Sequence, residues 1–245
     1  MPQTRFSPAR SRFGKSRVGK SLRRFVEFKG IRRSHASEYR ETVRRLYDGP
    51  RGAAIRLSSV ISLHDPLVGH MLRSGQFDLG RFRRVLDVGS GSGQVLRHVL
   101  RQTREDVHIV ACDLSPNMLH RARQRLKSDR PLFVAADMKN LPFNAGSFDC
   151  ITCGWVIEHL PDPRPGLREM FRVLEPGGSL LLMATEDTIA GAFSSRTWKC
   201  RTYNRDELRA ACEEVGFEWT QQFWFTRMHR ALRLGGILVE VRRPS

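Results

Sequence analysis

The apolar positions of the chain change period repeatedly from residue 83 onward. Short continuous apolar runs are typical of buried strands, whereas apolar residues at i, i+3, i+4 and i+7 are typical of helices. The runs predict strands at 84–88, 107–113, 131–137, 148–156 and 179–185, and a terminal hairpin-like pair at 218–225 and 236–243. The stripes predict helices at 94–103, from Ser115 onward, around 167–174 and from Asn204 to Gly216.

Residues at the predicted helix ends support these boundaries. Ser115 is a good N-cap, and Pro116 occupies the first helical position that tolerates proline. Asn204 with Glu207 three residues later forms a capping-box pattern, and Gly216 suits a helix end. The segment "PGG" at 176–178 is expected to end the helix before it.

Strands alternating with helices indicate a parallel sheet covered by helices on both faces. We therefore predict an α/β fold. It is a Rossmann-like, doubly wound, mostly parallel seven-stranded sheet with an antiparallel strand at the edge. The predicted organisation is a basic, poorly ordered arm at 1–33, a helical extension over the cleft at 34–82, and one domain at 83–245 with a lid-like insertion at 186–204.

The formal charge of +17 is concentrated at the start of the chain, where residues 1–33 hold eleven Lys and Arg against the single acid Glu27. A solvated arm is the simplest interpretation. Contact with anionic lipid headgroups, contact with nucleic acid and an organellar transit peptide remain open alternatives. No run of 18 apolar residues predicts a membrane span, and the five scattered cysteines favour a reduced, cytoplasmic setting, peripheral to a membrane if the arm binds lipid.

Three glycines follow the first predicted strand as G-x-G-x-G, at Gly89, Gly91 and Gly93. A dinucleotide fingerprint would need its third glycine at the position of Gln94. Two aspartates mark the same sheet edge: Asp87 beside the glycines can hold an ammonium group, and Asp113 after the second strand suits two ribose hydroxyls. Asp137, after the third strand, can accept from an exocyclic amine. An amine, a ribose and a carboxylate held by backbone amides describe S-adenosylmethionine (SAM), with no phosphate to bind.

Four blocks of sequence carry a family resemblance: "VLDVGSGSG", "ACDLSPNMLHRAR", "ADMKNLPFNAGSFDCIT" and "LREMFRVLEPGGSLLL". They resemble the class I SAM-dependent methyltransferases, nearest to the ubiquinone/menaquinone C-methyltransferase branch, over residues 83–185. The resemblance implies binding of SAM and its product S-adenosylhomocysteine. The implied cofactor-binding residues are Asp87, Gly89, Gly91, Gly93, Asp113, Leu114, Asp137, Met138, Cys153 and Trp155, with Gly154 near the transferred methyl.

The loop after the fourth strand reads "WVIEHLPD" and offers His159 as a general base, with Glu158 or Asp162 orienting it or replacing it. A role for His159 in shaping the loop is the alternative. Trp155 is either a ligand contact or a core aromatic.

The insertion at 186–204 supplies the candidate acceptor site. Trp198 and Tyr203, with Phe193, form a predicted apolar wall, and Arg201 is a predicted contact for a carbonyl or anionic group, as are Arg196 and Lys199. A surface excursion packed by its own aromatics is the alternative.

Cys150 and Cys153 are predicted to be core residues, because i and i+3 in a strand face opposite ways. No metal site is predicted, since the other histidines lack ligand spacing. The expected partner is a small-molecule or lipid acceptor. A nucleic-acid methyltransferase and a non-catalytic SAM-binding protein stay open as alternatives, and the oligomeric state is left open.

Overall fold

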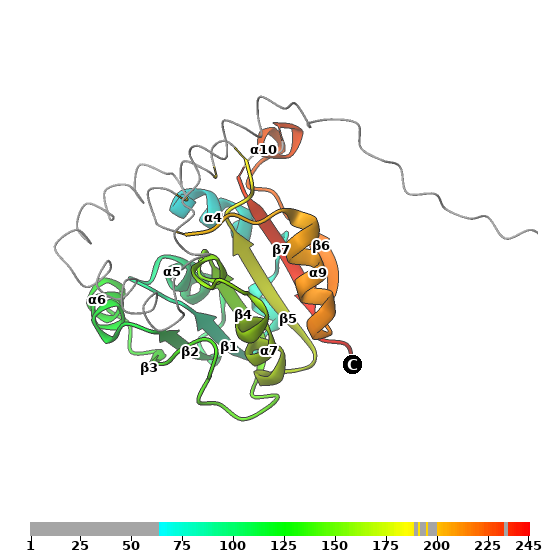
Figure 1. Ribbon diagram of the computed structural model, residues 1–245. Helices are drawn as coiled ribbons and strands as arrows, with labels where there is room; N and C mark the ends of the chain where they lie inside the picture. Colours follow the sequence, from blue (N-terminus) through cyan, green and yellow to red (C-terminus); the bar gives the residue numbers. More distant parts are fainter. Residues whose placement is uncertain (1–63, 189–190, 192–194, 196–199, 233–234) are drawn as a thin grey trace, which may run out of the picture.

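The computed structural model describes residues 64–188, 191, 195, 200–232 and 235–245. A seven-stranded sheet with the strand order β3-β2-β1-β4-β5-β7-β6 forms its centre (Figure 1). β7 is antiparallel to both β5 and β6, and the other neighbouring pairs are parallel. The strands are β1 (Arg84–Val88), β2 (His108–Asp113), β3 (Pro131–Ala135), β4 (Phe148–Gly154), β5 (Leu174–Ala184), β6 (Glu218–Gln222) and β7 (Ile237–Arg242).

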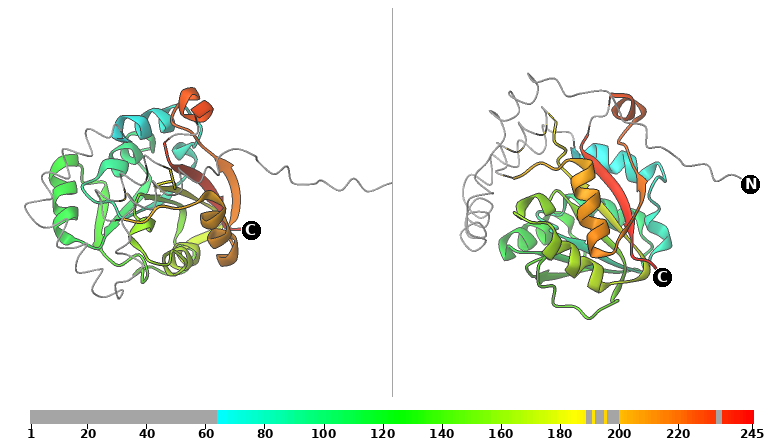
Figure 2. Two further views of the ribbon diagram at one scale, coloured as in Figure 1. Left: turned by 45° about the horizontal axis from the view of Figure 1, so that its top comes forward. Right: turned by 45° about the vertical axis from the view of Figure 1, so that its right-hand side comes forward.

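Helices cover both faces of this sheet, so the predicted fold class is confirmed. α7 and α9 lie on one face, and α4 and α5 on the other (Figures 1 and 2). The helices are α4 (His64–Arg73), α5 (Gln94–Gln102), α6 (Pro116–Leu126), α7 (Arg164–Val173), α9 (Arg205–Val215) and α10 (Arg227–Leu232), with short 3-10 helices η2 (Leu79–Arg81) and η3 (Ile157–His159). No helix in these described ranges combines the length and the apolar character that a membrane span needs.

Alternate strand residues supply the two halves of the core. In β5, Leu180 and Leu182 pack with α7 and α9, whereas Leu181 and Met183 pack with α4 and α5. Cys153 belongs to the first cluster and Cys150 to the second. Both cysteines are fully buried, so their predicted role as core residues is confirmed.

The chain before the first strand contributes to the second half of the core. Val68 and Met71 of α4 are buried there, and α4 packs on α5. Asp65 at the start of α4 accepts from the buried His98 ring at 3.0 Å and pairs with Arg97 at 2.5 Å. Residues 64–82, with α4 and η2, are the described part of the extension predicted at 34–82, while residues 34–63 and the arm at 1–33 lie outside the described residues.

The junction between the helix predicted around 167–174 and the strand predicted at 179–185 differs from the structure, whereas most other predicted ends differ by three residues or fewer. α7 ends at Val173, and Leu174 already has extended backbone and pairs with Phe148, so "PGG" lies inside β5 and does not end the helix. Leu174 is fully buried, but it enters the core from the strand. Its place seven residues after Leu167 therefore imitated helical spacing.

The start of α9 agrees with its predicted cap in part. The Asn204 side chain accepts from the N–H of Asp206, and Gly216 ends the helix with φ of 111°. Glu207 binds the Arg201 guanidinium, so the side chain expected to complete a capping box is engaged elsewhere.

Candidate functional site

The turn after β1 has a backbone that needs glycine. Gly89, Gly91 and Gly93 all have positive φ, at 70°, 52° and 81°. The N–H groups of Gly89 and Ser90 both donate to the Cys112 carbonyl, at 2.7 and 2.9 Å, which holds the turn against the end of β2. A Cβ on Gly89 would lie 2.2 Å from Cγ2 of Val156, so the turn also packs closely on the loop after β4.

Asp113 links this turn to the next one. One carboxylate oxygen accepts from the N–H of Gly91 at 2.9 Å, and the other accepts from the N–H of Ser115 at 2.8 Å. These two donors fix the carboxylate at the adjacent carboxyl ends of β1 and β2. Since each oxygen of a carboxylate has two lone pairs, this arrangement is compatible with binding the hydroxyls of a ribose. The next residue, Leu114, is one of four large apolar side chains that are exposed among the described residues, at 37%.

Asp87 lies beneath the glycine turn and is almost fully buried. Thr152 Oγ1 donates to its Oδ1 at 2.6 Å, while Oδ2 is buried without a hydrogen-bond partner among the described residues. Burial raises the pKa of Asp87 to about 6, and hydrogen bonds with Thr152 and Ser90 offset only part of this effect. A buried acceptor without a partner costs free energy that a nearby cationic group would relieve. The residues of this edge therefore fit the ammonium and ribose groups of SAM.

Asp137 and Met138 follow β3 on the same edge, and both are half-buried. The Lys139 N–H donates to Oδ1 of Asp137 at 3.0 Å, and the Lys139 ammonium lies 3.8 Å from Oδ2. The structure thus brings the third predicted carboxylate to the edge that carries Asp113. Its contact with an adenine amine stays a prediction.

Trp155 directly follows β4 and has a backbone conformation that is unusual for its residue type. Its φ is 56°, a left-handed value that costs a non-glycine residue roughly 1–2 kcal/mol. Its N–H donates to the Met183 carbonyl at 2.8 Å, and its half-buried ring stacks on Phe225 with a centroid distance of 6.5 Å. Strain of this kind tends to occur at functional sites. Cys153, two residues earlier, is packed in the core. Its contact with a cofactor stays a prediction.

Glu158 and His159, the predicted catalytic residues, lie side by side in η3 but have different surroundings. Glu158 is buried and accepts from both the N–H and the hydroxyl of Thr185, at 2.7 and 2.8 Å. Burial raises its pKa to about 7 despite these hydrogen bonds. His159 is half-buried, and burial lowers its pKa to about 4, so the imidazole is neutral at pH 7.

The described part of the predicted acceptor segment packs under the loop after β4. Tyr203 is fully buried, and its hydroxyl donates to the Ile157 carbonyl at 3.1 Å. Arg201 lies over the Tyr203 ring, donates to the Pro161 carbonyl at 2.7 Å and pairs with Glu207. These contacts give both side chains a place in the fold. Their contact with an acceptor stays a prediction, and Trp198, Phe193, Arg196 and Lys199 lie outside the described residues.

Sequence reasoning missed Thr152 and Thr185, which hold the buried carboxylates of Asp87 and Glu158. Thr152 is the register partner of Asp87 across β1 and β4, and this pairing requires the strand order. The missed Phe225 comes from the segment between β6 and α10. Within the described ranges, no three His, Cys, Asp or Glu side chains gather as metal ligands would.

Residues 86–182 match the methyltransferase-domain family. A ubiquinone/menaquinone biosynthesis C-methyltransferase of Vibrio cholerae is 35% identical over 105 residues, which are 41% of this chain and 40% of that protein. A demethylmenaquinone methyltransferase of Clavibacter sepedonicus is 39% identical over 100 residues, or 40% of each chain. The match thus spans about two fifths of the length of these relatives.

Solved structures share the fold over most of the chain at lower sequence identity. A SAM-dependent methyltransferase from Thermotoga maritima superimposes with a TM-score of 0.62 at 17% identity, covering 83% of this chain and 100% of that one. A second SAM-dependent methyltransferase, from Mesorhizobium loti, superimposes with a TM-score of 0.57 at 20% identity, covering 70% of this chain and 95% of that one. Residues 86–182 are therefore identified as a methyltransferase domain, and the solved structures show that it has the fold of SAM-dependent methyltransferases.

Proposed function

We propose that the protein transfers a methyl group from SAM to a small amphipathic, aromatic or lipid-like acceptor, with a quinone-like ring as the leading candidate. The observation that carries the cofactor half is the carboxylate of Asp113, held by the Gly91 and Ser115 amides at the end of β2. The acceptor half is supported by the relatives, two of which are named for quinone methylation.

The chain's part in the reaction is mainly to bind and align. When bound, SAM supplies a methyl group that its sulfonium already activates. Asp113 binds the ribose, Asp87 holds the ammonium group from beneath, and Leu114 covers the adenine. The glycine turn lets the backbone approach the ligand closely. Fixed orientation of two reactants is a large source of rate enhancement, so these contacts supply most of the catalysis.

Removal of a proton from the acceptor falls to His159. Its imidazole is neutral at pH 7, half-buried and able to accept a proton, whereas Glu158 is buried and held by Thr185. Glu158 therefore acts as a positioning residue that ties the loop after β4 to the end of β5. A general base of this kind assists an acceptor that loses a proton as it is methylated, such as a hydroquinone ring or a phenol.

A nucleic-acid methyltransferase is the second candidate, favoured by the net charge of +17. The end of β4 and the loop after it read "CGWVIEHL" and lack both the Asn/Asp-Pro-Pro-aromatic box of base-amine methylases and the Pro-Cys pair of cytosine-C5 enzymes. We therefore place the small-molecule acceptor first. The cellular location that accompanies it is cytoplasmic and peripheral to a membrane.

Incubation with methyl-labelled SAM and fractionated cell extract tests this proposal. We expect label in the lipid or small-molecule fraction. His159→Gln should reduce that incorporation while leaving SAM affinity within about twofold. Label that appears only in RNA, or SAM binding without any turnover, would contradict the proposal.

A further inference from the structure

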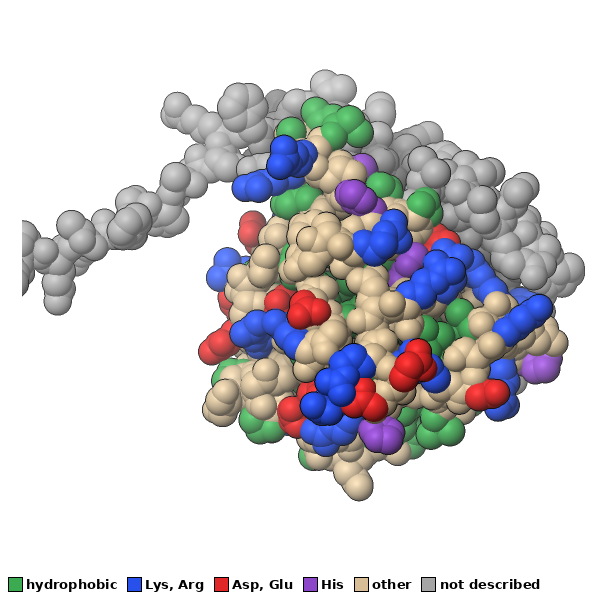
Figure 3. Space-filling model, turned by 180° about the vertical axis from the view of Figure 1, so that it is seen from behind, with side chains coloured by type: hydrophobic (Ala, Val, Ile, Leu, Met, Phe, Trp, Pro, Cys, Tyr) green, Lys and Arg blue, Asp and Glu red, His purple; other side chains and the backbone are tan. Residues whose placement is uncertain are grey.

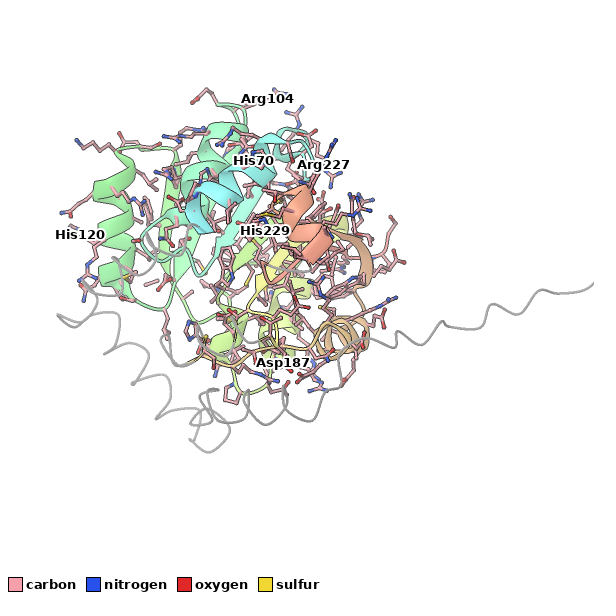
Figure 4. All side chains as sticks on the ribbon, turned by 90° about the horizontal axis from the view of Figure 1, so that it is seen from above. His70, Arg104, His120, Asp187, Arg227 and His229 are labelled. Carbon is pink, nitrogen blue, oxygen red and sulfur yellow. The ribbon has the colours of Figure 1, made fainter. Side chains whose placement is uncertain are left out.

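α10 interrupts the chain between the two antiparallel strands at the edge of the sheet. It lies above the carboxyl end of the sheet, beyond the ends of β4 and β5 (Figure 1). In the view from above, α10 lies beside α4, while His120 on α6 lies at the far side of the molecule (Figure 4). A helix in this place is next to the candidate site.

The outer surface of α10 is apolar and cationic. Met228 and Leu232 are 62% and 61% exposed, and their i, i+4 spacing places both on one side of the helix. Arg227 is exposed on a flank of this pair and Arg230 on the opposite side of the helix, and neither forms an ion pair within the described part of the chain. Figure 3 shows apolar and Lys/Arg side chains adjoining at the top of the molecule.

The inner side of α10 leads to the candidate site through aromatic contacts. The ring of His229 meets Phe225 edge-on at 5.6 Å, and Phe225 stacks on Trp155 at the end of β4. Thr226 Oγ1 lies 2.7 Å from Nδ1 of His229, which orients the imidazole. The helix thus connects an exposed apolar surface to the strained tryptophan beside the predicted methyl-transfer position.

We propose that α10 docks on an anionic membrane surface and that the lipid-like acceptor enters beside it. Paired apolar side chains next to arginines are what a helix in the headgroup region presents: apolar groups enter the acyl boundary, and cations remain among the phosphates. The packed rings of His229, Phe225 and Trp155 link the docked helix to the candidate site. The entry step rests on the proposed function, whereas docking does not.

Sedimentation with vesicles tests docking without SAM or acceptor. The full chain is mixed with vesicles of phosphatidylcholine alone, or with three tenths phosphatidylglycerol. We expect binding to the anionic vesicles, and a partition coefficient at least about tenfold lower for the double variant Met228→Ser/Leu232→Ser, because two exposed apolar side chains no longer enter the lipid. Arg227→Gln should weaken binding by about fivefold, from the loss of one cation near the surface.

Leu132→Ser is the matched control, because Leu132 is 63% exposed on β3 at the other edge of the sheet. The Leu132→Ser variant should change vesicle binding by less than about twofold, and thermal melts should show that it and the Met228→Ser/Leu232→Ser variant are folded. Equal binding by the wild type and the double variant, an equal loss in the Leu132 control, or binding of labelled RNA without binding of vesicles would overturn docking. Absence of methyl transfer by a wild-type protein that binds the anionic vesicles would instead count against the proposed function.

Discussion

Two carboxylates near the candidate site have opposite surroundings. Asp113 is half-buried, and its two oxygens each accept a backbone N–H at the ends of β1 and β2. Glu158 is buried, and both of its oxygens face Thr185. Both side chains are carboxylates near the carboxyl end of a strand. The hydrogen bonds of Asp113 hold it between two turns at the sheet edge, where a ligand can bind, whereas those of Glu158 hold it inside the fold, where it positions a loop.

Asp113→Ala should weaken SAM binding at least about tenfold. The variant loses charge-assisted hydrogen bonds to the ribose, each of which contributes roughly 1.5–3 kcal/mol before water compensates. Titration calorimetry measures the affinity. Asp129→Ala, in an exposed loop after α6, is the control and should bind like the wild type. Unchanged affinity in the Asp113 variant would refute the ribose assignment.

Glu158→Gln should alter how stability depends on pH. The Glu158 carboxyl has a pKa of about 7 in the native state and about 4.5 when unfolded. Between these values the native state binds more protons, so the wild type loses stability as pH rises. Glutamine does not titrate but fills the same space beside Thr185.

As pH rises from 5 to 8, the free energy of unfolding of the Glu158→Gln variant should therefore increase relative to that of the wild type, by as much as about 3 kcal/mol. Urea unfolding of both proteins at the two pH values measures the difference. Asp87 and His159 titrate in both proteins, so they do not affect this comparison. A difference that is the same at both pH values would show that burial does not raise the pKa of Glu158.

At the scale of elements, the glycine turn after β1 and the loop after β4 depend on each other. Gly89 leaves room for the branched side chain of Val156, while Gly91 faces more open space, with Cε of Met118 at 3.7 Å from a built Cβ. Both glycines have positive φ. A methyl group at either position therefore adds backbone strain, but only at Gly89 does it also displace another loop.

Gly91→Ala should lower stability by about 1–2 kcal/mol through strain alone. Gly89→Ala should cost clearly more and should also weaken SAM binding, because the turn and the loop after β4 must separate. Thermal melts and calorimetry of the two variants measure both effects. Adding Val156→Ala should recover part of the loss in the Gly89 variant only. Equal losses in the two glycine variants would show that the close contact with Val156 is unimportant.

The elements themselves follow closely from the sequence, because buried strands and amphipathic helices have distinct periods. β1 was predicted with its observed ends, and Ser115 caps α6 as expected. Leu174 shows the limit, since one buried leucine fits a helical stripe and a strand equally well. The site was predictable where chain order determines it, as at Asp113. It was not predictable where strand pairing does, as at Thr152, or where a distant segment supplies the contact, as Phe225 does for Trp155.

At the scale of the whole molecule, Glu240 joins the chain before the sheet to its last strand. It is buried in β7 and accepts from Arg81 and Arg242 at 2.8 Å and from Ser179 at 2.7 Å. Although burial raises its pKa, the hydrogen bonds from Arg242 and Ser179 and the two cations together hold the pKa below its usual value. The charge of Glu240 therefore stabilises the native state at pH values above the usual glutamate pKa, and this contribution is lost as pH falls through the lowered native pKa.

Glu240→Gln should destabilise the protein by about 1–2 kcal/mol at pH 7, since both arginines are more than a third exposed and solvent screens the pairs. For a chain of this size that corresponds to a fall of roughly 2–8 °C in Tm. The deficit should shrink toward pH 4. Glu175→Gln, which breaks the more exposed pair with Arg84, is the control and should change Tm less. A deficit that persists unchanged at pH 4 would contradict the ionic account.

The direction of β7 has a practical consequence. Because this strand runs opposite to its neighbours, the chain from Arg242 to Ser245 lies at the amino ends of the parallel strands, across the molecule from α10 and the glycine turn (Figure 1). A fluorophore or a surface anchor attached within this segment would therefore leave the ligand edge facing outward. Immobilised in this way, the protein could be presented to vesicles or to SAM in a defined orientation.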